Sequence, residues 1–218
     1  MAALKTKSSL IKKFSVALFK APLVQSFRTA LGDHDILENV LCSIELDDGT
    51  KGYGEAAIAG HITGETLAGT IKNLRSLEID LKGENAGEYL AISAQLHERF
   101  AKNKSAVAAA ETALLDALTR QWRIPLWRFF GRSPRLLRSD ITIVIADLEE
   151  TQASVKKFYS QGFRVFKVKV GRDPELDYQR VLAVSRGAPR CVLYLDANQG
   201  YSAQQTLDFL KRLKRVGI

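Results

Sequence analysis

The chain has 218 residues and a formal net charge of +8. Because 46% of its residues are apolar, a chain of this length can bury a substantial core, and we expect two domains. The positive charge does not favour nucleic-acid binding, because it is concentrated near the two ends of the chain without the interleaved aromatic residues of a basic binding surface. No run of about 20 apolar residues predicts a membrane-spanning helix, and Cys42 and Cys191 lack metal-ligand spacing, which favours reduced thiols in a cytoplasmic protein.

Residues 11–60 predict an antiparallel meander of three strands, because apolar and alternating runs are separated by turn residues. The first run alternates over residues 14–18, the second covers Val40–Leu46, and the third ends through Gly52-Tyr53-Gly54-Glu55. Asp47-Asp48-Gly49, between the second and third runs, is typical of a hairpin turn.

The stretch between the first two runs, residues 25–32, is rich in small residues and predicts a loop that contains Arg28. Such a loop can close over a ligand, and the guanidinium group of Arg28 can form two parallel hydrogen bonds with a carboxylate. The alternative is an arginine exposed to solvent on a surface loop, and the spacing alone favours that alternative.

Residues 65–121 predict three helices, because apolar residues recur at spacings of three and four. The third helix, Ser105–Gln121, is rich in alanine. We expect it to end before Pro125, because proline disfavours helical backbone at the residue that precedes it. The apolar positions that define the three helices are Leu67, Ile71, Leu74 and Leu77, then Tyr89, Ile92, Leu96 and Phe100, and finally Leu114, Leu115 and Leu118.

After Ser139, strands and helices alternate. Strand-like runs begin near residues 141, 165 and 191, so the pattern repeats every 24–26 residues, as successive βα units do. This repeat predicts a parallel α/β architecture. A closed eightfold barrel needs roughly 200–250 residues, whereas residues 139–218 hold three units. We therefore expect either a small open α/β domain or a fragment of a barrel.

Two lysines and one aspartate are the candidate reaction centre of this region. Alternation along Val165–Val170 puts Lys167 and Lys169 on one face of a strand, and the next apolar run, Cys191–Leu195, ends on Asp196. Because ligands bind at the C-terminal ends of parallel strands, we expect these three side chains to meet there. The alternative for either lysine taken alone is a solvent-exposed side chain at a strand edge.

Those residue types suit proton transfer beside a metal ion. Inside a barrel, burial and neighbouring positive charge favour the neutral amine, so a lysine there can act as a base near neutral pH. Asp196 and Asn198 offer hard oxygen ligands, which suit Mg²⁺. One carboxylate does not hold Mg²⁺ tightly, so further ligands must come from elsewhere.

A set of motifs spread over nearly the whole chain resembles a known family. The most specific are Lys167-Val168-Lys169-Val170-Gly171 and Asp196-Ala197-Asn198-Gln199-Gly200. The others are Phe27-Arg28-Thr29-Ala30, Glu38-Asn39-Val40-Leu41, Asp47-Asp48-Gly49-Thr50, Gly52-Tyr53-Gly54-Glu55-Ala56, Thr63-Gly64-Glu65-Thr66, and the alanine-rich helix through Glu111, Ala113 and Asp116. In this order they resemble the enolase superfamily, in its muconate lactonizing enzyme subgroup, and most of all its dipeptide (Ala-Glu) epimerases.

The resemblance implies an α+β capping domain, residues 1–138, followed by the first three βα units of a (β/α) barrel, residues 139–218. It implies that Lys169 abstracts or returns a proton alpha to a carboxylate, and that Lys167 helps to neutralise the substrate carboxylate and the enolate. Asp196 would be the first of three acidic Mg²⁺ ligands.

Three further residues are implied as substrate contacts. Asn198 would support the metal ligand and the substrate. Arg28 would pair with an acidic substrate side chain. The resemblance favours this role at least as much as the alternative, an arginine exposed to solvent. Thr142, on the first barrel strand, is a weaker candidate, for which packing within the strand is the alternative.

The function implied is a Mg²⁺-dependent isomerase that epimerises dipeptides of the Ala-Glu type, acting on a small molecule rather than on nucleic acid or membrane, and assembled as a homo-oligomer. Muconate cycloisomerases, o-succinylbenzoate synthases and N-acylamino acid racemases share the lysine motif and are the alternatives within the subgroup. The other metal ligands and the second base would lie beyond Ile218, so we expect the 218 residues alone to be inactive. The alternative of another class is a truncated, non-catalytic ligand-binding protein.

Overall fold

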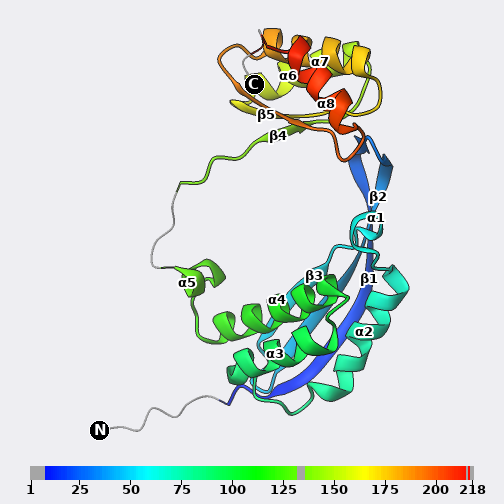
Figure 1. The fold of residues 1–218 in the computed structure, drawn as a ribbon. Helices are drawn as coiled ribbons and strands as arrows, with labels where there is room; N and C mark the ends of the chain where they lie inside the picture. Colours follow the sequence, from blue (N-terminus) through cyan, green and yellow to red (C-terminus); the bar gives the residue numbers. More distant parts are fainter. Residues whose placement is uncertain (1–7, 132–135, 215, 217–218) are drawn as a thin grey trace. The chain divides into compact units, whose positions relative to one another are not determined.

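The computed structural model describes residues 8–131, 136–214 and 216, which form two compact units (Figure 1). The first unit consists of residues up to 21 together with residues 37–135, and the second of residues 22–36 together with residues 136–218. The structure thus groups residues 22–36 with the C-terminal part of the chain. The domain boundary that the resemblance places after residue 138 stays a prediction.

An antiparallel sheet of three strands, in the order β1-β2-β3, confirms the predicted meander. The second and third strands pair from Glu45↔Lys51 to Val40↔Ala56, around the turn expected at Asp47-Asp48-Gly49. The strands are β1 (Ile11–Thr29), β2 (Gly32–Leu46) and β3 (Lys51–Ala56).

Residues 25–32, which the sequence predicts as a loop, form the end of β1, a two-residue turn and the start of β2. The loop prediction was wrong because composition says little about strand pairing: two paired strands satisfy their backbone groups whatever side chains they carry. Ala30, in the turn, lies very near Gly171 and Gly200, since a Cβ atom added to these glycines would lie 2.9 and 2.6 Å, respectively, from Ala30 Cβ. Both glycines therefore permit the close approach of the tip of the β1–β2 hairpin, residues 22–36, which we call the hairpin tip.

The helices of the first unit cover one face of its sheet, and the three long ones confirm the helices predicted from apolar spacing (Figure 1). Thr66 caps the first long helix, because its side chain accepts a hydrogen bond from the Gly69 amide at 3.1 Å. The helices are α1 (Gly60–Thr63), α2 (Leu67–Asp80), α3 (Tyr89–Arg99), preceded by the 3₁₀ turn η1 (Ala86–Glu88), α4 (Lys104–Gln121) and α5 (Leu126–Phe130).

Helix α4 packs directly against strand β3. Gly54 faces the helix so closely that a Cβ atom there would lie 1.9 Å from the carbonyl oxygen of Ala109, and one at Gly52 would lie 2.1 Å from the Ala117 amide nitrogen. The alanines of α4 and the glycines of β3 thus let the two backbones meet. Around this contact lies the core of the first unit, which includes Val40, Ile44, Leu74 and Leu118.

The second unit contains a parallel sheet in the order β4-β5-β6, which confirms the predicted parallel α/β architecture. Its strands are β4 (Ile141–Ile143), β5 (Val165–Lys169) and β6 (Val192–Asp196), and its helices are α6 (Leu148–Ser160), α7 (Pro174–Gly187) and α8 (Ala203–Arg212). One face of β5 packs under the helices: Phe166, Val168 and Val170 are at most 2% exposed. The opposite face of β5 is left for Lys167 and Lys169, as its alternation predicts.

Helices α6, α7 and α8 each begin after a capping residue. The side chain of Asp147 accepts from the Glu150 amide at 2.7 Å, and that of Asp173 from the Glu175 amide at 2.9 Å. Ser202 and Gln205 form a reciprocal capping box. These local signals fix where each helix starts, and therefore how long the loop is that follows the preceding strand.

No helix in the part of the chain that the structure describes has both the length and the apolarity that crossing a membrane requires.

Candidate active site

The parallel register of the second unit brings the predicted reaction centre together. Lys169 is the pairing partner of Asp196 across β5 and β6. The Nζ atoms of Lys167 and Lys169 lie 2.9 and 2.8 Å from the same carboxylate oxygen, Oδ2 of Asp196. Two ammonium groups therefore converge on one carboxylate at the C-terminal ends of the two strands.

The two lysines differ in how deeply their side chains are buried. The side chain of Lys169 is 6% exposed, whereas that of Lys167 is 36% exposed. The ring of Phe27, from the hairpin tip, contributes to this difference, because its centroid lies 5.6 Å from Lys169 Nζ and covers the amine in a cation–π contact. Lys169 is thus the amine held away from bulk water.

Asn198 connects both charged partners. Its side-chain oxygen accepts a hydrogen bond from Lys169 Nζ at 2.6 Å, and its backbone amide donates to Asp196 Oδ1 at 2.9 Å. The backbone of Asn198 has φ of +44°, in the left-handed region that asparagine tolerates better than most residues. This turn after β6 is what lets one residue reach both partners.

The Asp196 carboxyl is held in its charged form. Its partial burial would raise its pKa, but hydrogen bonds from Lys169, from Lys167 and from the Asn198 amide together lower the pKa far below its ordinary value. An ionised carboxylate at the end of a strand is the form in which aspartate binds a divalent cation.

The oxygen atoms of Asp196 and Asn198 are hard ligands and fit part of a Mg²⁺ site. Within residues 8–131, 136–214 and 216, however, no group of three or more His, Cys, Asp and Glu side chains is arranged to hold a metal ion. The described residues therefore supply one carboxylate toward such a site rather than a complete set.

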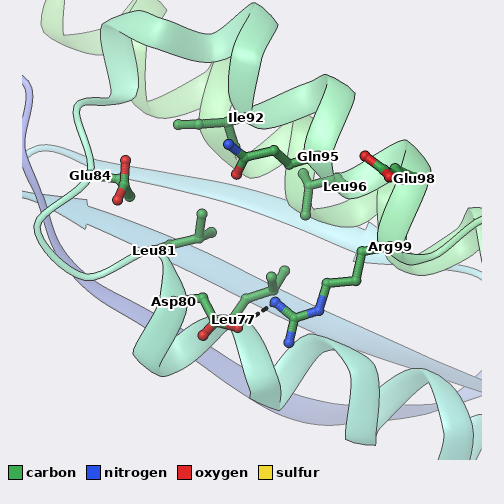
Figure 2. A pocket seen from close by; sticks show the side chains of 9 residues that line it. All are labelled: Leu77, Asp80, Leu81, Glu84, Ile92, Gln95, Leu96, Glu98 and Arg99. Atoms are coloured by element: carbon green, nitrogen blue, oxygen red, sulfur yellow. Dashed lines mark hydrogen bonds and ion pairs between the residues drawn. The ribbon is translucent and has the colours of Figure 1, made fainter.

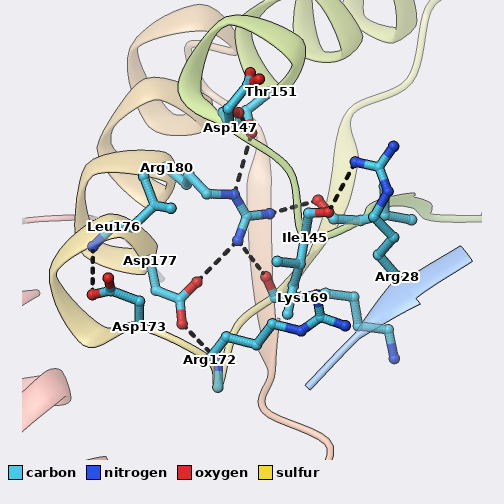
Figure 3. Close-up of polar contacts among 12 residues, drawn as sticks. Arg28, Ile145, Asp147, Thr151, Lys169, Arg172, Asp173, Leu176, Asp177 and Arg180 are labelled. Atoms are coloured by element: carbon cyan, nitrogen blue, oxygen red, sulfur yellow. Dashed lines mark hydrogen bonds and ion pairs between the residues drawn. The ribbon is translucent and has the colours of Figure 1, made fainter. Parts of the chain in front are cut away.

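Arg28 forms an ion pair with Glu150, which lies in the first turn of α6. The Nη1 atom of Arg28 donates to Glu150 Oε2 at 2.8 Å and to the carbonyl of Ile145 at 3.4 Å. The ion pair ties Arg28 to the start of α6. Figure 3 shows Arg28 beside Ile145, whose carbonyl accepts the second hydrogen bond. The role of Arg28 as a substrate contact stays a prediction, and the guanidinium already has a carboxylate partner.

Arg172 is a second tie between the hairpin tip and the parallel sheet. Its Nε atom donates to the carbonyl of Thr29 at 2.8 Å, and it forms an ion pair with Asp33. These partners lie more than 130 residues away along the chain, so no local pattern in the sequence predicts the contact.

Thr142 lies on β4, where it is the pairing partner of Lys167, and it is partly buried. Paired residues on neighbouring strands point to the same side of a sheet. Thr142 therefore shares the face that carries the two lysines, although its contact with a substrate stays a prediction.

A separate pocket of about 350 Å³ lies between α2 and α3 of the first unit (Figure 2). An ion pair between Arg99 and Asp80 joins its two sides. None of the candidate reaction-centre residues lines it. The lining residues are Leu77, Asp80, Leu81, Glu84, Ile92, Gln95, Leu96, Glu98 and Arg99.

Comparison with protein families agrees with this geometry. Residues 13–131 match the N-terminal domain of the mandelate racemase / muconate lactonizing enzyme family. The chain belongs to this family. Residues 150–218, which carry Lys167, Lys169 and Asp196, match the enolase C-terminal domain-like family, so the enolase-superfamily resemblance is confirmed.

Two similar proteins are epimerases by name. The chain is 45% identical over 207 residues to the hydrophobic dipeptide epimerase of Citrifermentans bemidjiense, and the match covers 93% of this chain and 56% of that relative. It resembles the substrate-liganded L-Ala-D/L-Glu epimerase from Bacillus subtilis with a TM-score of 0.88 and 29% identity, over 95% of this chain and 59% of the other.

A third relative was solved with both a metal and a dipeptide. The dipeptide epimerase from Enterococcus faecalis V583, complexed with Mg and L-Leu-L-Tyr, matches with a TM-score of 0.88 and 30% identity, over 96% of this chain and 59% of that one. The chain thus spans 56–59% of the length of these three relatives.

Proposed function

We propose that the whole protein to which this chain belongs is a Mg²⁺-dependent dipeptide epimerase. The observation that carries the proposal is the convergence of Lys167 and Lys169 on Asp196 at the ends of β5 and β6. Its support is that relatives with 45% and 30% identity are named dipeptide epimerases, one of them with Mg bound.

Each residue would have a distinct task. Lys169, the shielded amine, accepts or returns at Nζ the proton on the carbon next to a carboxylate. Lys167, which is more exposed, pairs with that carboxylate as negative charge develops on it. Asp196, with Asn198 beside it, would hold the Mg²⁺ ion, which supplies the positive charge that stabilises the enolate. Inversion also requires a proton donor on the opposite face of the carbon, and we assign that role to no residue of this chain.

The Ala-Glu substrate implied by the sequence resemblance makes a specific demand on Arg28. Its guanidinium would have to exchange the carboxylate of Glu150, now 2.8 Å away, for that of the substrate side chain. An apolar dipeptide requires no such exchange, and the 45% identical relative is a hydrophobic dipeptide epimerase. A dipeptide with an apolar side chain is therefore the second candidate substrate.

A dipeptide panel tests both substrates. The whole protein is incubated with L-Ala-L-Glu or with L-Ala-L-Phe, in Mg²⁺ or in excess EDTA, and the stereoisomers are separated by chiral chromatography. We expect inversion of at least one dipeptide in Mg²⁺ and none in EDTA, and the faster substrate identifies the class. If neither dipeptide is inverted while an N-acylamino acid in the same panel is, the protein is a racemase of the same subgroup and the epimerase proposal fails.

A further inference from the structure

Arg180 has the largest fully buried side chain that the structure describes. It projects from α7 toward the C-terminal edge of the parallel sheet (Figure 3), and its side chain is 0% exposed. Its ion-pair partner Asp177, one turn earlier, is 2% exposed. The contact of Arg180 with the candidate reaction centre is to the backbone of Lys169, and the role proposed above for the lysines uses neither Arg180 nor Asp177.

The guanidinium group of Arg180 connects three elements. Its Nη1 atom donates to the carbonyl of Lys169 at 2.9 Å, at the end of β5, and its Nη2 atom donates to the carbonyl of Val144 at 2.6 Å, just after β4. Its Nε atom donates to the hydroxyl of Thr151 on α6 at 3.2 Å. The ends of two adjacent strands are therefore held by one planar group.

Asp177 extends the same network to the third strand. One carboxylate oxygen accepts from Arg180 Nη1 at 3.0 Å. The other accepts from the Gly171 amide at 2.6 Å and from the Tyr201 hydroxyl at 2.7 Å. Because Tyr201 lies in the loop between β6 and α8, the pair links this loop to the ends of β4 and β5.

The desolvation cost of burying this ion pair indicates that the pair does more than fill the core. Burial of an ion pair carries a large desolvation penalty, and an apolar side chain of similar volume often stabilises a core as well or better. Burial lowers the pKa of Arg180 despite the opposing effect of Asp177. An arginine alone among the side chains offers five donors in a rigid plane, which is what bridging carbonyls from two strands requires.

We propose that Arg180 and Asp177 are positioning residues, which set Lys169 and the loop that carries Asn198 in the arrangement that the reaction needs. The catalytic consequence of this inference, a change in turnover, rests on the proposed function. Arg180 holds the backbone of Lys169, and Asp177 holds the loops on either side of the site through Gly171 and Tyr201. A displacement of the amine by about 1 Å costs on the order of 10²-fold in rate.

The first test compares two variants of α7 in the whole protein. Arg180→Lys keeps the charge but lacks the planar fork, so we expect kcat for exchange of the dipeptide α-proton in D₂O to fall about 10²-fold with little change in KM. Val184→Ala is the matched control: Val184 is 0% exposed on the same helix and belongs to the apolar core. It should lower Tm and leave kcat unchanged. An equal loss of kcat in both variants, or wild-type kcat in Arg180→Lys, overturns the proposal.

The second test needs no activity. Amide hydrogen exchange is followed at Gly171 and over residues 197–201 in Tyr201→Phe, which loses only its hydrogen bond to Asp177, and in Arg180→Lys. We expect about tenfold faster exchange at these positions, and no local change in Val184→Ala. Wild-type exchange rates in both network variants, or a uniform rise along the chain, contradict the positioning role.

These two readouts separate the two hypotheses. If the wild-type protein exchanges the α-proton of no dipeptide, the proposed function fails, and the amide exchange alone decides whether the pair positions the strand ends. If the wild-type protein is active and the variants behave like Val184→Ala, the proposed function stands and the positioning role is lost.

Discussion

Lys167 and Lys169 have the same functional group and the same carboxylate partner, yet their surroundings differ sixfold in exposure, 36% against 6%. Phe27 and Asn198 both contact Lys169 and contribute to its lower exposure. A base must exchange its proton with the substrate rather than with water, so the shielded amine is the better candidate.

Replacement of Lys169 by alanine should therefore lower kcat for α-proton exchange by roughly 10²- to 10⁴-fold, the usual contribution of a positioned acid or base. The measurement is steady-state α-proton exchange in D₂O at saturating dipeptide and Mg²⁺, with circular dichroism to confirm folding. Lys156→Ala, at an exposed position on α6, is the control and should keep wild-type turnover. A fully active Lys169→Ala variant would exclude this lysine as the base.

Cys42 allows a prediction about pH. Burial in β2 raises the pKa of its thiol to about 12, against a weaker opposing effect of the Gly54 backbone. At pH 8.5 the folded protein should therefore resist iodoacetamide at Cys42, whereas the urea-unfolded chain should react. Since the fold favours the neutral thiol, this residue's contribution to stability is complete below the ordinary thiol pKa near 8.5 and declines as pH rises toward 12. Labelling of Cys42 at equal rates in both states would contradict this.

At the scale of elements, the contact of β3 with α4 depends on two glycines. A Cβ atom at Gly54 would meet helix backbone at 1.9 Å, and backbone cannot move aside as a flexible side chain can. Gly54→Ala should therefore lower the free energy of unfolding by about 3 kcal/mol or more. Gly131 is the control, because a Cβ atom there would meet nothing within 4 Å and its φ is not positive, so Gly131→Ala should change stability by less than about 1 kcal/mol.

Urea denaturation of both variants measures this difference. Equal midpoints for the two alanine variants would show that the sheet and α4 tolerate a wider separation than the structure has.

Sequence patterns predicted those elements whose signals are local. Alternation in β5 placed the lysines on one face, and apolar residues at spacings of three and four marked the three long helices of the first unit. The hairpin tip was not predicted, because strand pairing leaves little trace in composition.

Contacts between distant residues account for the rest. Glu150 and Arg28 are 122 positions apart, so the pairing of Arg28 was not visible in either segment. Arg180 sits in a helix with several charged residues, and nothing in its local spacing distinguishes a buried arginine from an exposed one. Only the fold shows that two strand-end carbonyls converge on it.

At the scale of the whole molecule, residues 13–131 match the N-terminal domain of the mandelate racemase / muconate lactonizing enzyme family, and residues 150–218 match the enolase C-terminal domain-like family. The hairpin tip, residues 22–36, groups with the second unit and covers the lysine face through Phe27. The hairpin tip and the ends of β5 and β6 thus belong to one compact unit.

The most direct test of the central claim is α-proton exchange by the whole protein in D₂O, followed by proton NMR with a saturating dipeptide and Mg²⁺. We predict loss of the signal of the α-proton next to the carboxylate, no loss in EDTA, and no loss in Asp196→Asn. Retention of that signal by folded wild-type protein at saturating Mg²⁺, across both acidic and apolar dipeptides, would contradict the proposed epimerase.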